Sequence, residues 1–263
     1  MGTIQTITSS FMIQMKNKFS LIPVWLWLLQ IVLTSFFSMF FFACLADYIG
    51  NPEVSIQYVV IGNAVQSIAV STLYATSILP GTEKHIGTLP YFVSAPPRLF
   101  TIMFGMGVFN LLSGIVAAAF SLTASALVFN VDFSSCDMLS IVVTIALTVL
   151  SLSGLGMAVG GIGVRLRSSA VMANLISYLG WVLCGVNFPV SSLPDWLQVV
   201  SYCHPLTYAV EATRKAVGGC SLTDMSYELS MMVLLGAVTF LLSFFLFSWF
   251  EHMARNSGAL EQF

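Results

Sequence analysis

Charge is what this sequence has least of. Only 8% of its 263 residues are charged, whereas 57% are hydrophobic, and the mean hydropathy is +0.92. A soluble domain of this length would aggregate with so little charge on its surface, so a soluble globular protein is excluded. The formal net charge of -2 gives no reason to expect nucleic acid as a partner. The composition predicts a polytopic integral membrane protein made of one all-α domain, residues 1–263.

A nucleotide-binding motif is also missing. A P-loop ends in a lysine followed by Ser or Thr, so that backbone amides and the lysine surround the phosphates. Here Lys16, Lys18, Lys84 and Lys215 are followed by Asn, Phe, His and Ala. We therefore expect no cofactor in this chain, and any energy from ATP must come through a separate subunit.

Catalytic and metal-binding patterns are absent too. His85, His204 and His252 lie in different segments, and no HExxH or ligand-spaced neighbours accompany them. The long apolar segments contain no acid, base or histidine, which a membrane-embedded hydrolase would need and an ion-coupled carrier usually has. We expect no catalytic residue and no metal site.

The five cysteines form no CxxC pair and have no metal-ligand spacing. Most are expected to act as small apolar packing residues. Cys203 and Cys220 flank a segment that we place on the outer side, which leaves a disulfide between them open.

Long apolar runs are what the sequence has in abundance. A membrane-spanning helix needs about 20 apolar residues, and the chain has room for about six. The second run ends at Pro80-Gly81, where a helix end is expected. We predict six transmembrane helices near residues 21–45, 56–79, 101–129, 139–164, 170–187 and 229–250.

The first 20 residues mix apolar residues with Lys16, Lys18 and glutamines. This pattern predicts a helix in the cytoplasmic interface, with a partly disordered tail as the alternative. Trp25 and Trp27 are expected to anchor the start of the first span at the interface. No cleavable signal peptide is expected, because the lysines precede the apolar run and no small-residue cleavage pattern follows it.

The distribution of basic residues predicts the orientation. Arg214 and Lys215 fall on one side of the predicted spans, and the exterior loops contain Pro52, Glu53 and Asp137. The positive-inside rule places the more basic side in the cytoplasm, so both termini are expected there, with the chain in the cell membrane. The other side has seven of the nine basic residues: Lys16, Lys18, Lys84, Arg98, Arg165, Arg167 and Arg255.

Residues 188–219 are too broken by proline to be one span and too apolar to be a solvated loop. They predict two short amphipathic helices, re-entrant or interfacial, before the last span. Ser192 has capping-box spacing to Asp195, and Pro205 suits the first turn of the second helix. Glu211 has the spacing to pair with Arg214 and Lys215.

Two runs in this segment, LPDWLQ from Leu193 and HPLTYAVEATR from His204, resemble the region before the last span of ABC-2 permeases. Those permeases are the membrane-spanning half of an ABC exporter, with a type V exporter fold. Where the family usually has Asn-Pro, this chain has His204-Pro205. The resemblance implies that the short helices gate the outer exit and are held at the interface by Trp196 and Tyr208. The residues of this implied gate are Leu193, Pro194, Trp196, Pro205, Tyr208, Glu211 and Arg214.

The run EKHIGTL, residues 83–89, resembles the E-x-x-x-G-T-L run between the second and third spans of the same family. There it forms a coupling helix that docks on the ATPase subunit, so residues 80–98 are the implied coupling segment. Glu83 with Lys84 would supply a charged docking edge, and a plain polar loop is the alternative. Arg165 and Arg167 would make a second contact or act as positive-inside anchors. The implied coupling residues are Glu83, Lys84, Gly87, Thr88, Leu89 and Arg98.

Uncharged polar residues follow helix faces within three of the spans. Such stripes either line a path for an amphiphile or hydrogen-bond neighbouring helices. The resemblance favours lining for the second and fifth spans. The candidate path residues are Gln30, Thr34, Ser38, Asn63, Gln66, Ser71, Tyr74, Asn174, Tyr178 and Trp181.

Five glycines crowd the end of the fourth span, and Gly156 with Gly160 forms a GxxxG motif. This motif lets helices approach closely. The contact is either packing within one chain or a seam between two.

The resemblance implies a permease subunit of an ATP-driven exporter that moves a drug, a lipid or another amphiphile. Its implied partners are a second permease, identical or related, cytoplasmic ABC ATPase subunits that bind ATP and Mg, and membrane lipids. Export of a lipid-linked polysaccharide or teichoic-acid-like polymer is an alternative for the same fold. Alternatives of another class are an ATP-independent channel or secondary carrier, and a membrane scaffold without transport.

Overall fold

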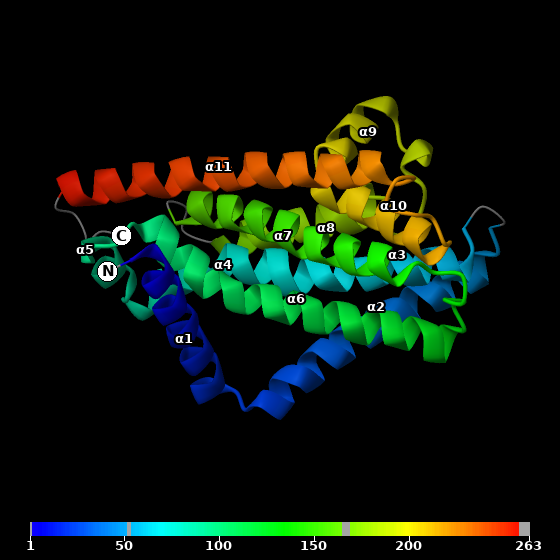
Figure 1. Cartoon of the computed structure of the whole chain (residues 1–263), viewed down its shortest axis with the longest axis horizontal. Coiled ribbons are helices and arrows are strands. Elements are labelled where there is room, and N and C mark those ends of the chain that lie inside the picture. Colours follow the sequence, from blue (N-terminus) through cyan, green and yellow to red (C-terminus); the bar gives the residue numbers. More distant parts are fainter. Residues whose placement is uncertain (1, 52–53, 165–168, 258–263) are drawn as a thin grey trace.

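The computed structural model describes residues 2–51, 54–164 and 169–257, and within these ranges every regular element is a helix. Five helical runs in this part of the chain are long and apolar enough to cross a membrane. They lie together in one elongated bundle (Figure 1). The runs are α2 (Val24–Ile49), α3 (Ile56–Ala69) continued through η1 (Val70–Tyr74) and α4 (Ala75–Ile86), α6 (Leu99–Phe129), α7 (Met138–Gly163) and α11 (Ser226–Ser257).

The predicted span at 170–187 is shorter than expected. Its helix, α8 (Ser169–Leu183), has 15 residues, which at 1.5 Å per residue is about 22 Å. The hydrocarbon core of a bilayer is about 30 Å thick. The chain then turns at Gly185, whose φ of +71° is left-handed. The structure thus has five long apolar helices and a shorter one where the remaining span was predicted.

The second span also differs from expectation, because its helix does not end at Pro80-Gly81. It continues through Pro80 to Ile86. The ring of Pro80 packs against Gly160 of α7, where an added Cβ would lie 3.2 Å from two ring carbons. Tertiary packing therefore outweighs the helix-breaking tendency of an interior proline.

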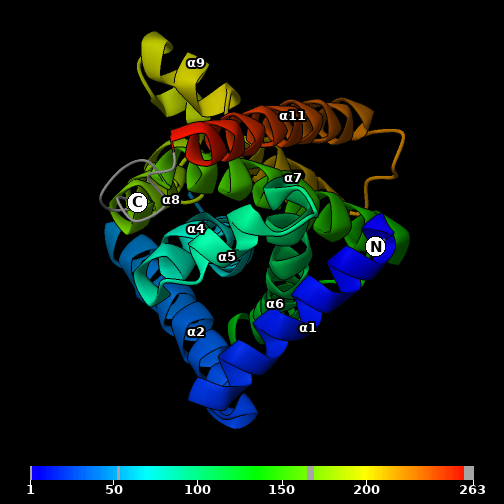
Figure 2. The same ribbon diagram turned by 90° about the vertical axis from the view of Figure 1, so that its left-hand side faces the viewer.

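The N-terminal residues are helical, as predicted. Helix α1 (Thr3–Leu21) ends just before Pro23 and lies obliquely against α6 (Figure 2). The two helices approach closely at Gly105, where an added Cβ would lie 2.8 Å from the carbonyl oxygen of Ile7. This helix excludes a disordered tail for residues 3–21.

The two ends of the bundle carry different segments. The start of α1, the end of α11 and α5 (Leu89–Ser94) lie at one end, which we call the α5 end, and α10 (Pro205–Val217) lies toward the other, the α10 end (Figure 1). Arg255 joins the α5 end by donating to the carbonyls of Val93 and Ala95. Of the residues used to predict orientation, Pro52, Glu53, Arg165 and Arg167 lie outside the described residues.

Two short helices, α9 (Asp195–Tyr202) and α10, occupy the proline-rich segment, as predicted. Pro205 begins α10, and the Nδ1 atom of His204 accepts from the backbone N–H of Leu206 at 3.1 Å. The predicted capping box at Ser192 is wrong. That residue belongs to the 3-10 turn η2 (Val190–Ser192), and Pro194 precedes α9 without a side-chain cap. The intervening Leu193-Pro194 pair keeps the backbone extended and moves the hydroxyl away from the helix start.

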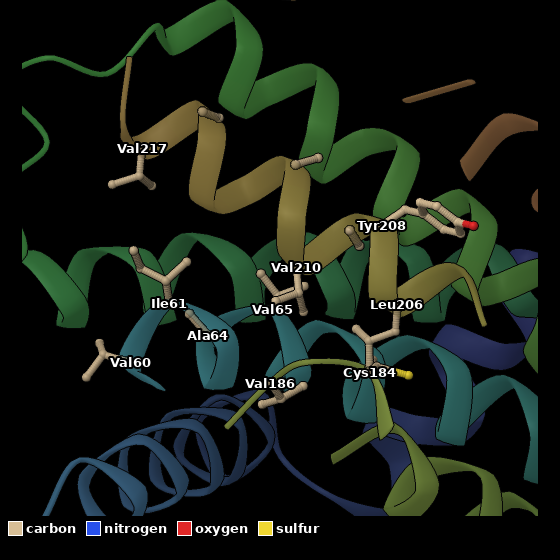
Figure 3. Packing of buried hydrophobic residues seen from close by; sticks show 14 of the residues in the cluster. Val60, Ile61, Ala64, Val65, Cys184, Val186, Leu206, Tyr208, Val210 and Val217 are labelled. Atoms are coloured by element: carbon tan, nitrogen blue, oxygen red, sulfur yellow. The ribbon is translucent and has the colours of Figure 1, made fainter. Parts of the chain in front are cut away.

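Helix α10 forms part of the core. Figure 3 shows Leu206 and Val210 in one cluster with Val65 of α3 and with Cys184 and Val186 of the turn after α8. Tyr208, expected at the membrane interface, is only 2% exposed, whereas Trp196 of α9 is 69% exposed. Helix α10 was predicted to be amphipathic, and its contacts with α7, α11 and α3 bury most of it but leave Lys215 exposed.

Candidate functional site

An open cavity with many polar lining residues, which we call the polar cavity, lies between α2, the α3–α4 run and α6. Its volume is about 280 Å³. The cavity is open on one side, since Gln30 and Thr34 in its lining are exposed, and its polar groups can bind water or a ligand. Its polar lining residues are Lys18, Gln30, Thr34, Ser35, Ser38, Gln66, Ser67, Ser71, Tyr74, Asn110 and Ser113.

Most of the predicted path residues gather at this cavity. Those that line it are Gln30, Thr34, Ser38, Gln66, Ser71, Tyr74 and Trp181. Tyr178 lines a neighbouring cavity instead, Asn63 lies in a hydrogen-bonded chain beside the polar cavity, and Asn174 lines neither cavity. The sequence reading missed Asn110 and Ser113. A signal was present, since Asn110 is an amide within a long uncharged apolar helix.

The second span changes its winding beside the cavity. Residues Val70–Tyr74 form a π-helical turn, a feature often found at functional sites. An added Cβ at Gly114 of α6 would lie 2.0 Å from the Thr72 hydroxyl, and one at Gly156 of α7 would lie 2.6 Å from the Leu73 carbonyl oxygen. The two glycines therefore hold the π turn between α6 and α7.

The GxxxG motif packs within this chain. Gly156 faces the π turn, and Gly160 faces Ser77 and Pro80 of α4, with an added Cβ 3.0 Å from the Ser77 carbonyl oxygen. Of the two interpretations that the sequence left open, this supports close packing of α7 on the second span.

A chain of hydrogen bonds borders the cavity toward the α10 end. Ser38 of α2 donates to Asn63 Oδ1 of α3 at 3.2 Å, and Asn63 Nδ2 donates to Asn187 Oδ1 at 2.8 Å. Asn187 Nδ2 then donates to the Trp181 carbonyl oxygen of α8 at 3.3 Å. We call these four residues the polar wall. They join α2, α3, α8 and the turn after α8.

Arg214 is the centre of the predicted outer gate. Its Nη2 atom donates to the carbonyls of Tyr58 at 2.9 Å and Val186 at 3.0 Å, and its guanidinium lies 3.4 Å from the centre of the Tyr58 ring. Gly62 makes room, because an added Cβ would lie 2.1 Å from the Val186 oxygen. Burial lowers the pKa of Arg214 to about 10, so it stays charged at neutral pH. Arg214 thus fastens α10 to α3 and to the turn after α8.

The ion pairs expected of Glu211 are wrong among the described residues. Lys215 pairs instead with Glu228 of α11 at 2.6 Å, and Arg214 turns to the carbonyls described above. Helical spacing indicated the nearest acid along the chain, but α11 brings a closer one. Among the described residues, no three His, Cys, Asp or Glu gather as metal ligands would. Cys203 and Cys220 are free thiols, so no disulfide joins them.

The α4–α5 corner differs from the predicted charged edge. Glu83 is 3% exposed, and its carboxylate accepts a short hydrogen bond from the Thr88 hydroxyl. Lys84 donates to the Val164 carbonyl at the end of α7 at 3.1 Å. Gly87 ends α4 with a φ of +81°. The acid and the lysine therefore fix the corner internally.

Other residues supply the outer surface of this corner. His85, Ile86, Gly87 and Tyr91 are exposed, whereas Leu89 is buried. Arg98 is exposed next to α6, with its guanidinium 5.7 Å from the centre of the Phe244 ring. The sequence reading missed Ile86 and Tyr91, although two large apolar residues on a short polar segment were a usable signal.

Comparison with known proteins adds the family. The model of the ABC-2 type transporter family matches residues 2–217. The chain is also 20% identical over 166 residues to the "Probable multidrug ABC transporter permease YbhR" of Escherichia coli strain K12, and equally to that of Escherichia coli O157:H7. The matches cover 63% of this chain and 45% of each relative, so the chain spans about half the length of the curated relatives it matches. The chain belongs to the ABC-2 type transporter family, as a multi-pass membrane component of a transporter.

Proposed function

We propose that this chain is the permease subunit of an ATP-driven exporter, and that its polar cavity is part of the path of an amphiphile. The observation that carries the proposal is the cavity of about 280 Å³, to which long apolar helices contribute hydroxyl and amide side chains among apolar ones. A helix bundle that only packed against itself would bury such groups in mutual hydrogen bonds. Here Gln66 Oε1 and Trp181 Nε1 are buried without a partner.

The α4–α5 corner is the proposed contact for a cytoplasmic ABC ATPase that binds ATP and Mg²⁺. The Glu83–Thr88 bond and the Lys84–Val164 bond stiffen the corner, and the exposed Ile86 and Tyr91 offer an apolar contact. Helix α4 continues through the π turn into the cavity wall. A displacement at the corner would therefore reach Ser71 and Tyr74 along one continuous helical run.

The outer gate would be the contact between α10 and its neighbours. Arg214 bridges α10, α3 and the turn after α8, so opening the path at this end requires its two carbonyl bonds to break or to move together. A second permease copy, identical or related, would complete the path, and membrane lipids would cover the apolar faces of α2 and α11.

In this proposal the α5 end faces the cytoplasm and the chain resides in the cell membrane. Lys84, Arg98 and Arg255 lie near that end, whereas Arg214 and Lys215 lie toward the other. The positive-inside rule supports this orientation.

Gly87 provides the test of coupling. An added Cβ at Gly87 meets nothing within 4 Å, so Gly87→Ala and Gly87→Trp place the same strain on its left-handed backbone and differ in bulk toward the exterior. The full complex, purified with the ATPase with which it associates, should hydrolyse ATP faster when an amphiphile is added. We expect Gly87→Trp to lose this stimulation and Gly87→Ala to keep most of it. Normal stimulation in Gly87→Trp would contradict the docking assignment, and failure to isolate any ATPase would favour a channel or carrier.

A further inference from the structure

A second cavity adjoins the polar one, and its chemistry is different. Its volume is about 460 Å³, and its lining is almost entirely apolar, including Phe42, Leu45, Val59 and Val182. It lies between α2, α3, α8 and the turn after α8. Trp181 lines both cavities, so the two compartments are neighbours.

The polar wall runs along the boundary between the two cavities, and Trp181, one of its members, lines both. Ser38 lines the polar cavity, Asn187 lines the apolar one, and Asn63 hydrogen-bonds to both. The Trp181 ring stacks with Tyr178 at 5.7 Å and lies 6.2 Å from the Phe42 ring, both on the apolar side. One molecule that fills both compartments must therefore be hydrogen-bonding at one end and apolar at the other.

Charge limits the class of head group. Of the described residues that line the polar cavity, Lys18 alone is charged, and those that line the apolar cavity carry no charge. Lys18 lies in the last turn of α1, just before the corner with α2, where the rings of Phe19, Trp27 and Phe109 pack with centroids 5.6–5.8 Å apart. A cation in this cavity would meet a like charge and no carboxylate, whereas an anion would find a counter-ion.

Two polar atoms of lining residues are buried in protein without a hydrogen-bond partner. Gln66 is 1% exposed and lines the polar cavity, with Oε1 unpartnered while Nε2 donates to the Ser177 carbonyl. The indole Nε1 of Trp181 is also without a partner. Because protein encloses these two atoms, a head group in the polar cavity would meet the more exposed polar residues Gln30, Thr34 and Ser71.

We propose that the two cavities together bind one amphiphile of the uncharged or anionic class, with its head group in the polar cavity and its tail in the apolar cavity. The inference rests on the proposed function, of which it specifies the substrate class. Lys18, the one charged side chain among the described lining residues, disfavours a cationic head group.

Trp181 is a built-in reporter for the test. The full chain is reconstituted in lipid nanodiscs with Trp25, Trp27, Trp196 and Trp249 changed to Phe, which leaves Trp181 as the fluorophore. Three probes share one dibrominated decyl chain and carry a glucosyl, a sulfate or a trimethylammonium head group. A matched protein that keeps only Trp249, exposed on α11 and outside both cavities, reports simple partition of each probe into lipid.

We expect saturable quenching of Trp181 by the glucosyl and sulfate probes, and at least about tenfold weaker binding of the ammonium probe. Trp249 should show only non-saturable quenching. Lys18→Gln should reduce the preference for sulfate over ammonium by about tenfold, whereas Lys16→Gln, exposed two residues away, should leave it unchanged. Ala46→Phe fills the apolar cavity and should weaken all saturable binding, whereas Cys44→Phe on the exposed face of the same helix should not.

Binding of the ammonium probe as tight as that of the sulfate probe would overturn the charge assignment. Non-saturable quenching by every probe would overturn the site itself, which is the result expected if a second copy of the chain fills the apolar cavity. The comparison of the three probes uses a protein without substitutions at Lys18 or Ala46. It therefore tests the charge assignment even if Lys18→Gln or Ala46→Phe fails to fold. The binding test contains no ATP or ATPase. Saturable binding here, together with no ATP-dependent transport in vesicles that also contain the ATPase, would count against the proposed function and leave this inference standing.

Discussion

Arg214 offers the sharpest test of how the α10 end is held together. Its guanidinium donates to two carbonyl oxygens, of Tyr58 and Val186, and stacks on the Tyr58 ring. Hydrogen bonds from a charged donor contribute about 1.5 kcal/mol each, and a largely desolvated cation–π contact about 1 kcal/mol or more. Arg214→Met should therefore destabilise the fold by about 4 kcal/mol, since it also leaves both carbonyls without this donor. Arg214→Lys keeps the charge but loses the planar stack and one bond, so it should cost about half as much.

Thermal unfolding in detergent, followed by near-ultraviolet circular dichroism, measures the effect. At 2–4 °C per kcal/mol for a chain of this size, Arg214→Met should lower Tm by roughly 8–16 °C and Arg214→Lys by roughly half of that. Arg98→Met is the matched control, because Arg98 is exposed and has only a longer contact with the Phe244 ring, worth at most about 1 kcal/mol. A Tm for Arg214→Met within about 2 °C of the unaltered chain would refute the reasoning.

Two further predictions concern α7. Gly156→Val should disrupt the π turn and reduce the yield of folded protein, because its Cβ would lie 2.6 Å from the Leu73 oxygen. The control Gly107→Ala in α6 should be tolerated, because its Cβ would lie 3.7 Å from Thr76. Equal yields of the two variants on size exclusion would contradict the packing role of Gly156. The Ser140 hydroxyl holds the pKa of the Asp137 carboxyl below its usual value at the start of α7. Asp137 therefore stabilises the fold above the unfolded-state pKa of about 3.9, and this contribution is lost as pH falls through the lower folded value. Asp137→Asn keeps the helix cap but cannot titrate, so the Tm of this variant should fall less between pH 5 and pH 2.5 than the Tm of the unaltered chain. Identical Tm profiles against pH would show that the charge of Asp137 does not stabilise the fold.

The sequence predicted the helices well because their apolar runs are long and their ends are marked. The positions of α2, α6, α7 and α11, and the proline-broken pair α9–α10, follow from hydropathy and from Pro205 at a first turn. Two of its errors, at Pro80 and at Lys215, come from tertiary contact. Pro80 stays helical because Gly160 makes room for its ring, and Lys215 pairs with Glu228 because α11 lies beside α10.

For the candidate site, spacing identified the polar stripes but not their grouping. Seven of the ten predicted path residues line one cavity, because the stripes of α2 and α3 face each other. The pattern within each helix cannot reveal that Asn63 bonds to Asn187, or that the buried Glu83 accepts from Thr88. Those contacts depend on how the turn after α8 and the α4–α5 corner fold back on the bundle.

ATP-dependent uptake of a glucosyl or sulfate amphiphile into inside-out vesicles, which carry this chain together with its ATPase, is the most direct measurement. The account predicts uptake that requires ATP hydrolysis, stops in Gly87→Trp and persists in Gly87→Ala. Uptake of the same size without ATP, or undiminished uptake in Gly87→Trp, would contradict it.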